Sequence, residues 1–191
     1  MYLHCKYTRP DLDVDFYPNL LNSDLAKTWC LYLDSVFLNN SKAVAKEYTR
    51  TSMLFGDEGL IYRVTYQGST TETEVLPWDT LPALPELKKL VERVTQQEYT
   101  VCAIQRYPSG RIGIGPHRDK EMVAGTRIAG LSFGAQRTIE FTRAYHDPFD
   151  IPLPSGSLYV MNPPTNQKWL HSIIKQSKIK EARYSMTFRT Y

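Results

Sequence analysis

The C-terminal half of the sequence alternates apolar and polar residues with a period of two. From residue 99 onward, short runs rich in β-branched and aromatic residues are separated by Gly, Pro, Asn or Asp; the runs are YTVCAIQRY, TRIAGLSF, RTIEFTR, GSLYVMN, HSIIK and RYSMTFR. Successive side chains of a β-strand point to opposite faces, so this period predicts strands. Many short strands with no helix between them are typical of an all-β sandwich or barrel.

Two earlier segments have helical spacing instead. Between residues 23 and 37, SDLAKTWCLYLDSVF places apolar residues such as Leu25 and Trp29 one turn apart, and Ser23 or Asp24 is positioned to cap the first turn. Residues 85–97 repeat the pattern, and Pro85 suits the start of a helix. Between them, FGDEGLIYRVTY (residues 55–66) predicts a β-hairpin, because its glycines and aspartate favour turns.

The chain is long enough to bury one core, with 191 residues of which 42% are hydrophobic. No repeat or linker divides it, so we expect one domain, residues 1–191, of the α+β class and mainly β. Residues 99–191 are expected to form a double-stranded β-helix, or jelly roll, as the catalytic core. Residues 1–49 are expected to give N-terminal helical support, and residues 50–98 a hairpin lid and a helix.

Charge bears on the partner, and cysteine content on the compartment. The net charge of +3 and the pI near 8.7 support a polyanionic partner only weakly. Cys5, Cys30 and Cys102 lack the paired spacing of zinc sites or disulfide scaffolds, which indicates a reducing compartment, nuclear or cytoplasmic. No apolar run has the length of a signal peptide or a membrane span, so we expect neither secretion nor a membrane partner.

The motif HRD brings together two side chains that bind metals. On extended backbone, His117 and Asp119 point to the same face, and one more histidine would complete a two-histidine, one-carboxylate triad. Such a triad holds Fe(II) at three positions and leaves three open. Of the other histidines, His171 begins a predicted strand, whereas His4 lies near a terminus and His146 lies in a predicted solvated turn. An isolated HxD motif also occurs by chance, so this motif needs a second observation.

The last predicted strand, RYSMTFR, supplies that observation. Its alternation places Arg183, Ser185, Thr187 and Arg189 on one face. Two buried guanidinium groups are costly unless an anion neutralises them, which suggests a site for a small dicarboxylate such as 2-oxoglutarate. The keto-acid end could chelate iron and leave one position for O2, while the far carboxylate meets an arginine in a forked pair. The alternative is an edge strand with solvated arginines.

Gln105 and Tyr107 alternate onto one face of the strand that leads toward His117. An amide and a phenol are suitable hydrogen-bond partners for carboxylate oxygens. The alternative for Tyr107 is a surface aromatic residue that precedes Pro108.

The order of the parts QRY, IGPHRDKE, LSFGAQR, GSLYVMNPPTNQKWLHSI and RYSMTFR resembles the AlkB family of nucleic-acid dealkylating dioxygenases, from about Arg50 to the C-terminus. The resemblance implies Fe(II) as the metal, with 2-oxoglutarate and O2 as cosubstrates. It also implies catalytic iron ligands and cosubstrate-binding positions. The ligands would be His117, Asp119 and His171, and the cosubstrate residues Gln105, Tyr107, Ile114, Arg183, Ser185 and Arg189. Gln105 and Ser185 stand where the family usually has Asn, which puts cosubstrate affinity in doubt more than reaction type.

The resemblance also implies a hairpin lid, RTSMLFGDEGLIY, over a pocket for a flipped base. Phe55 and Tyr62 would stack on or line the base, Glu121 would accept a hydrogen bond from an exocyclic amino group, and Arg118 would contact the substrate. For Phe55 and Tyr62, simple core packing is the alternative.

Nine basic residues could contact phosphates, although each one alone is also typical of a solvated surface. They are Lys42, Lys46, Arg50, Arg63, Arg118, Lys120, Arg127, Arg137 and Arg143.

The implied function is oxidative demethylation of N-alkylated nucleobases, such as 1-methyladenine and 3-methylcytosine, in DNA or RNA, by a monomer. Hydroxylation of the methyl group would release formaldehyde and restore the base. One alternative keeps the iron chemistry but acts on a protein, a lipid or a small molecule. Another is a catalytically silent nucleic-acid-binding module. A zinc hydrolase is a less suitable interpretation, because its reaction would not use the two arginines of the last predicted strand.

Overall fold

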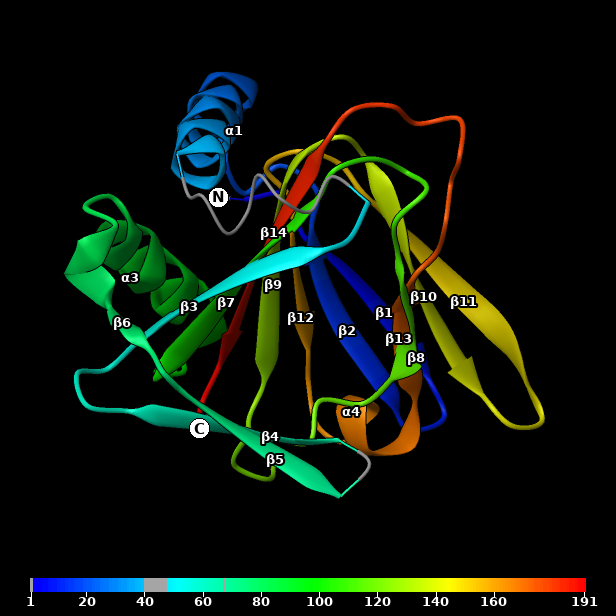
Figure 1. The fold of residues 1–191 in the computed structure, drawn as a ribbon. Helices are drawn as coiled ribbons and strands as arrows, with labels where there is room; N and C mark the ends of the chain where they lie inside the picture. The colour runs from blue at the N-terminus through cyan, green and yellow to red at the C-terminus, as the bar shows by residue number, and fades with distance from the viewer. Residues whose placement is uncertain (1, 40–47, 67) are drawn as a thin grey trace.

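The core of the protein is built from two β-sheets that face each other, with two helices on the outer face of the larger sheet (Figure 1). The computed structural model describes residues 2–39, 48–66 and 68–191. Within these residues, no helix combines the length and the apolar character needed to cross a lipid bilayer.

The larger sheet has eight strands in the order β1-β2-β12-β9-β14-β7-β3-β6. In chain order these strands are β1 (Cys5–Arg9), β2 (Leu12–Tyr17), β3 (Thr51–Gly56), β6 (Leu76–Pro77), β7 (Val101–Tyr107), β9 (Ile128–Gly134), β12 (Leu158–Met161) and β14 (Arg183–Arg189). The smaller sheet has four strands in the order β11-β10-β13-β8. These are β8 (Ile114–His117), β10 (Arg137–Arg143), β11 (His146–Leu153) and β13 (Leu170–Ile173). The predicted jelly roll is confirmed.

Strand β14 separates two apolar cores. Its residues Tyr184, Met186 and Phe188 pack on the helix side, together with apolar residues of β7, β9 and β12. The face that carries Arg183 and Arg189 is turned toward the smaller sheet, where the second core lies. The predicted alternation of this strand is therefore confirmed, and both arginines are buried, at 0% and 9% exposure.

Helix α1 (Ser23–Leu38) covers the larger sheet through Trp29, Leu33 and Phe37, as its spacing predicts, whereas Leu25 remains 44% exposed. The predicted cap was wrong, because Asn22 caps the helix by accepting a hydrogen bond from the backbone of Leu25.

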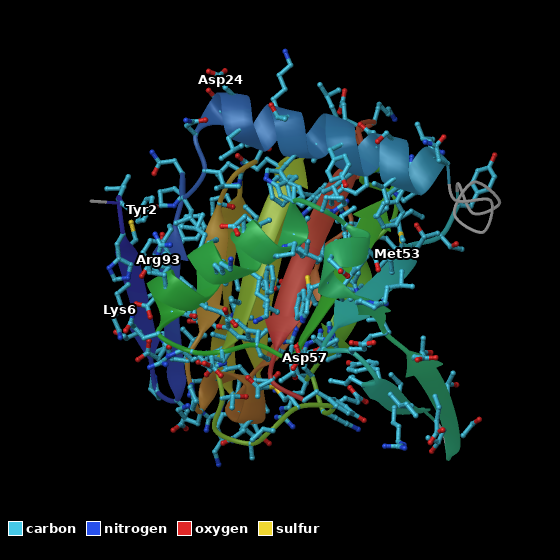
Figure 2. All side chains as sticks on the ribbon, turned by 90° about the vertical axis from the view of Figure 1, so that its left-hand side faces the viewer. Tyr2, Lys6, Asp24, Met53, Asp57 and Arg93 are labelled. Atoms are coloured by element: carbon cyan, nitrogen blue, oxygen red, sulfur yellow. The ribbon has the colours of Figure 1, made fainter. Side chains whose placement is uncertain are left out.

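Helix α3 (Leu84–Thr95) begins one residue before Pro85, the predicted start, and lies across the same face of the sheet, as Figure 2 shows. The short helices η1 (Trp78–Thr80) and α4 (Thr165–Lys168) lie in connections.

The predicted hairpin over residues 55–66 was wrong. Strand β3 pairs with β7 and β6 in the larger sheet, and the hairpin lies one strand later, between β4 (Ile61–Tyr66) and β5 (Ser69–Glu74). Gly56 serves a close approach of two strands, because a Cβ there would lie 2.6 Å from the carbonyl oxygen of Thr100. Gly59, with φ of 77°, makes the turn that carries the chain out of the sheet.

The N-terminal segment was predicted as helical support only, and this was incomplete. Residues of β2 alternate strictly, with Leu12, Val14 and Phe16 buried in the core between the sheets. The segment around His146, predicted as a solvated turn, begins strand β11, although the His146 side chain is exposed. The boundaries assigned to the three parts of the domain stay a prediction.

Candidate metal centre

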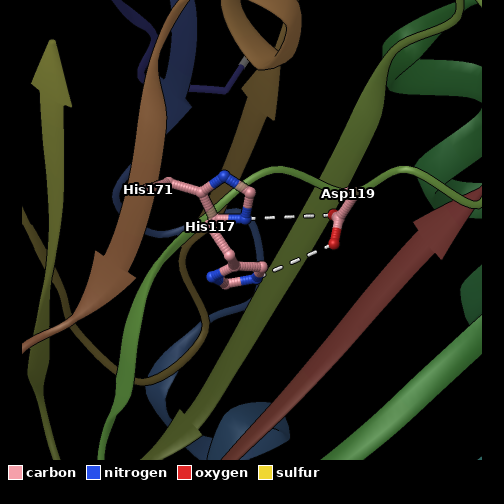
Figure 3. Close-up of side chains that lie close together, drawn as sticks. All are labelled: His117, Asp119 and His171. Carbon is pink, nitrogen blue, oxygen red and sulfur yellow. Dashed lines mark ion pairs between the residues drawn. The ribbon is translucent and has the colours of Figure 1, made fainter. Parts of the chain in front are cut away.

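Three side chains with metal-ligand atoms converge between the two sheets. In the smaller sheet His171 lies directly opposite His117, and Asp119 follows two residues after His117 (Figure 3). One ligand atom from each residue lies within 4.8 Å of the others. The Nε2 atoms of His117 and His171 are 3.8 Å and 3.9 Å from the two carboxylate oxygens of Asp119. The predicted trio is therefore brought together, and its role as a ligand set is a proposal.

The protonation states suit a divalent cation. Burial lowers the pKa of His171 to about 4, so its imidazole is neutral near pH 7. The Nδ1 of His117 lies 2.9 Å from the carbonyl oxygen of Gly115, which can only accept, so Nδ1 donates this hydrogen bond and Nε2 is the nitrogen that faces Asp119.

Burial would raise the pKa of Asp119, but Arg189 and the two imidazoles outweigh it and hold this pKa below its usual value. The trio therefore offers two imidazole nitrogens and one carboxylate as donors.

Arg189 holds the carboxylate of Asp119 in a two-pronged pair. Its Nε donates to one oxygen at 3.0 Å and its Nη2 to the other at 2.9 Å. Its Nη1 donates to the hydroxyl of Tyr62 at 3.1 Å. Burial alone would lower the pKa of Arg189, but the neighbouring Asp119 outweighs this effect and raises the pKa. This arginine therefore has an anionic partner within the protein.

Arg183 has no anionic partner in the part of the chain that the structure describes. Its side chain is fully buried, and Nη2 donates to Ser132 at 2.9 Å and to Ser185 at 3.3 Å. Its Nε and Nη1 atoms have no hydrogen-bond partner among the described residues. Burial lowers the pKa of this guanidinium, because the charged form loses its hydration. Such a group requires an anion of suitable shape.

The strand register explains why the predicted cosubstrate residues surround this guanidinium. Arg183 pairs with Tyr107 and Ser185 pairs with Gln105 across strands β14 and β7. The hydroxyl of Tyr107 donates to the Gln105 side chain at 3.2 Å.

A narrow cavity runs past these residues to the metal-binding trio. It is lined by Gln105, Tyr107, Ile114, His117, Asp119, Ile139, Tyr159, His171, Ile173, Ser185, Thr187 and Arg189.

These residues fit a bound Fe(II) and 2-oxoglutarate. The trio provides the oxygen and nitrogen donors that Fe(II) accepts. Arg183 does not itself line the cavity, but its guanidinium donates to Ser185 and lies 5.2 Å from the centre of the Tyr107 ring, and both of these residues line it.

The predicted substrate residues fall into two groups. Phe55 is 1% exposed and packs in the core on the helix side, so the core-packing alternative is correct and the predicted stacking on a base was wrong. Tyr62 is also buried, but its hydroxyl reaches Arg189 beside the metal-binding trio. Glu121 is half-buried and acts electrostatically on Tyr62, and Arg118 is exposed, with its guanidinium 3.5 Å from the carbonyl oxygen of Lys168.

The residues predicted to contact phosphates differ in their surroundings. The prediction for Arg137 was wrong, because this residue is 1% exposed and donates to backbone carbonyls of two neighbouring loops. Arg63 and Arg143 form ion pairs with Glu72 and Asp11.

Of the remaining residues predicted to contact phosphates, Arg127 donates to Asn162. One guanidinium nitrogen of Arg50 is buried. Lys120 is exposed and follows Asp119 directly in the chain. Lys42 and Lys46 lie outside the described residues.

Two residues near the trio escaped prediction. Tyr159 lines the cavity, and its alternation within GSLYVMN, which puts it on the face opposite Leu158 and Val160, was the available signal. Asn166 binds the backbone of Asp119, a contact that joins residues far apart in sequence and leaves no local signal.

The fold and the site together define a jelly-roll protein with a two-histidine, one-carboxylate centre beside a buried cation. Residues 13–189 match the 2OG-Fe(II) oxygenase superfamily, so the chain belongs to this superfamily, whose name states its metal and cosubstrate.

The chain is similar to the DNA oxidative demethylase ALKBH2 of Bos taurus (36% identity over 151 residues, 73% of this chain and 52% of that protein). It is similar in the same way to ALKBH2 of Homo sapiens (36% over 153 residues, 73% and 56%). It is also similar to the alpha-ketoglutarate-dependent dioxygenase alkB homolog 3 of Rattus norvegicus (32% over 122 residues, 58% and 41%). The chain spans about half the length of these curated relatives.

Among solved structures, that of OsALKBH1 superimposes with a TM-score of 0.64 at 12% identity, covering 97% of this chain and 99% of that one. At this identity the likeness concerns the fold alone.

Proposed function

We propose that this chain is an Fe(II)- and 2-oxoglutarate-dependent dioxygenase that removes methyl groups from N-alkylated bases of DNA or RNA, with 1-methyladenine and 3-methylcytosine as expected substrates. The observation that carries the proposal is the convergence of His117, Asp119 and His171 on a cavity that is also lined by Tyr107 and Ser185, the neighbours of the unneutralised guanidinium of Arg183. The names of the ALKBH2 relatives, DNA oxidative demethylases, support the substrate class.

When bound, Fe(II) with 2-oxoglutarate and O2 supplies the oxidising chemistry that hydroxylates the N-methyl group, after which formaldehyde is released. The protein supplies position, electrostatics and exclusion of water. Arg183 binds the far carboxylate of the cosubstrate in a forked pair, and Tyr107 and Ser185 orient it. Ile114 and the neighbouring apolar side chains of the cavity exclude water.

On the substrate side, the β4–β5 hairpin takes the place of the lid predicted over residues 50–62. A base must leave its stack to reach a buried centre. Tyr62 then presents its ring beside the trio, Glu121 accepts a hydrogen bond from an exocyclic amino group, and Arg118 contacts the nucleotide. Lys120 and Arg118, both exposed next to the trio, attract the phosphate backbone.

The test is incubation with oligonucleotides that carry 1-methyladenine or 3-methylcytosine, in the presence of Fe(II) and 2-oxoglutarate, followed by mass spectrometry. Wild-type protein is expected to remove 14 mass units from the base, roughly the mass of one CH2 group, and His117→Ala and Arg183→Ala are expected to be inactive. Succinate formation that methylated oligonucleotide does not accelerate would instead favour a protein, lipid or small-molecule substrate. Absence of iron-dependent succinate with every substrate would favour a silent binding module. The monomeric state and the nuclear or cytoplasmic location stay predictions.

A further inference from the structure

The carboxylate-bearing segment of the centre lies outside regular structure. Strand β8 ends at His117, so Asp119 has no strand partner for its backbone N–H and carbonyl groups. The side chain of Asn166 supplies both missing partners. Its Oδ1 accepts from the Asp119 backbone N–H at 3.0 Å, and its Nδ2 donates to the Asp119 carbonyl oxygen at 2.7 Å. A side-chain amide is the group that can replace a neighbouring strand in this way.

Asn166 is itself held on a fixed support. It lies in α4, where the adjacent Thr165 is fully buried and its hydroxyl exchanges hydrogen bonds with the backbone of Asp13 at 2.8 Å and 3.0 Å. At the other end of α4, the buried Trp169 donates to the carbonyl oxygen of Pro10 at 3.0 Å. Two residues later the chain reaches His171. The same short helix therefore determines the position of one histidine and, through Asn166, that of the carboxylate.

We propose that Asn166 is a positioning residue that fixes the backbone of Asp119 relative to the two histidines before the metal binds. Arg189 orients the carboxylate group, and Asn166 holds the main chain from which it projects. The proposal rests on the proposed metal centre. Loss of a residue that supports a metal ligand typically weakens metal binding about 10- to 100-fold.

The test is a calorimetric titration of metal-free protein with Mn(II), which needs no substrate and no turnover. Asn166→Ala is expected to raise the Kd for Mn(II) about 10- to 100-fold relative to wild type. The same variant is expected to alter the visible absorption spectrum of bound Co(II), because the geometry of its ligands changes.

Asn162→Ala is the matched control. Asn162 lies in the same connection and bonds Asp13, Asp15 and Arg127, but makes no hydrogen bond to the segment of Asp119. This variant is expected to lower the melting temperature and to keep the wild-type Kd for Mn(II). Should Asn166→Ala fail to fold, Asn166→Ser, which keeps one hydrogen-bonding atom, is titrated in its place and is expected to bind Mn(II) more weakly than wild type.

Equal Mn(II) affinity in wild type and the Asn166 variant, with only the melting temperature lowered, would overturn the inference and leave the metal centre intact. An equal loss of affinity in Asn162→Ala would also overturn it, because the effect would then come from general destabilisation. Failure of the wild type to bind Mn(II) would overturn the metal centre on which the inference rests. A wild-type protein that binds Mn(II) but does not demethylate the oligonucleotides would contradict the proposed substrate and leave the inference about Asn166 standing.

Discussion

Replacement of Arg183 by methionine is expected to weaken the binding of 2-oxoglutarate but not to destabilise the cosubstrate-free protein. Methionine keeps an unbranched apolar stem in the buried site but removes the charge. In the structure this charge is fully buried, donates to two serine hydroxyls, lies 5.2 Å from the centre of the Tyr107 ring, and leaves Nε and Nη1 without a hydrogen-bond partner among the described residues. Removal of an unpaired buried charge is neutral or stabilising, so the melting temperature of Arg183→Met without cosubstrate is expected to stay equal or to rise.

The expected loss of binding follows from the hydrogen bonds that Arg183 would donate to the far carboxylate of the cosubstrate. Each charge-assisted hydrogen bond contributes about 1.5–3 kcal/mol, so a forked pair contributes about 3–6 kcal/mol. That free energy corresponds to a rise in the Kd for 2-oxoglutarate on the order of 10²- to 10⁴-fold. A cosubstrate concentration of 100 times its Kd stabilises wild type by about 2.7 kcal/mol. For a chain of this length the melting temperature then rises by roughly 5–10 °C.

The assay is thermal unfolding with Mn(II), with and without 2-oxoglutarate, and Arg137→Met is its matched control. Arg137 is as buried as Arg183, but its guanidinium donates to the carbonyl oxygens of Ser109, Ile112 and Ile174. Its removal leaves these carbonyls unpaired, so Arg137→Met is expected to lose about 3–5 kcal/mol of stability. A wild-type response of Arg183→Met to 2-oxoglutarate, or a loss of stability as large as that of Arg137→Met, would refute this reasoning.

Three further substitutions test individual contacts. Tyr62→Phe removes the hydroxyl that binds Arg189 and is expected to destabilise the protein by about 1 kcal/mol in urea unfolding; an unchanged midpoint would show that this bond contributes nothing. Phe55→Ala is expected to cost about 3–5 kcal/mol in the same assay, because Phe55 lies in the core, and a loss below 1 kcal/mol would contradict this placement. Gly130→Ala would bring a Cβ within 2.3 Å of the Tyr159 ring, so a lowered melting temperature and weaker 2-oxoglutarate binding are expected, and an unaltered protein would disprove the close packing.

The alternation of single strands could be predicted from the sequence, but the pairing of strands could not. The period of RYSMTFR correctly placed Arg183 and Arg189 on a face opposite Tyr184, because the geometry of one strand determines it. The same reasoning placed FGDEGLIYRVTY in one hairpin, although Gly56 serves a close strand approach and only Gly59 makes a turn. Glycine favours both roles, and only the neighbouring strand decides between them.

In the candidate site, too, some residues could be predicted from the sequence and others could not. The HxD spacing, the small number of histidines and the two arginines of the last strand together predicted His117, Asp119 and His171, which the structure brings together. Phe55 was assigned to the substrate from the family resemblance, and its strand pattern could not correct this, because such a pattern does not tell which of two faces meets a core and which meets a ligand. Asn166 could not be predicted, because its contact depends on how a loop approaches a helix 47 residues away in sequence.

The most direct test of the metal centre is anomalous X-ray diffraction from crystals of the protein grown with Mn(II). The account predicts one strong anomalous peak within coordination distance of His117 Nε2, His171 Nε2 and a carboxylate oxygen of Asp119, and the absence of that peak in His171→Ala. A peak bound elsewhere, or a peak at this position that survives the substitution, would contradict it.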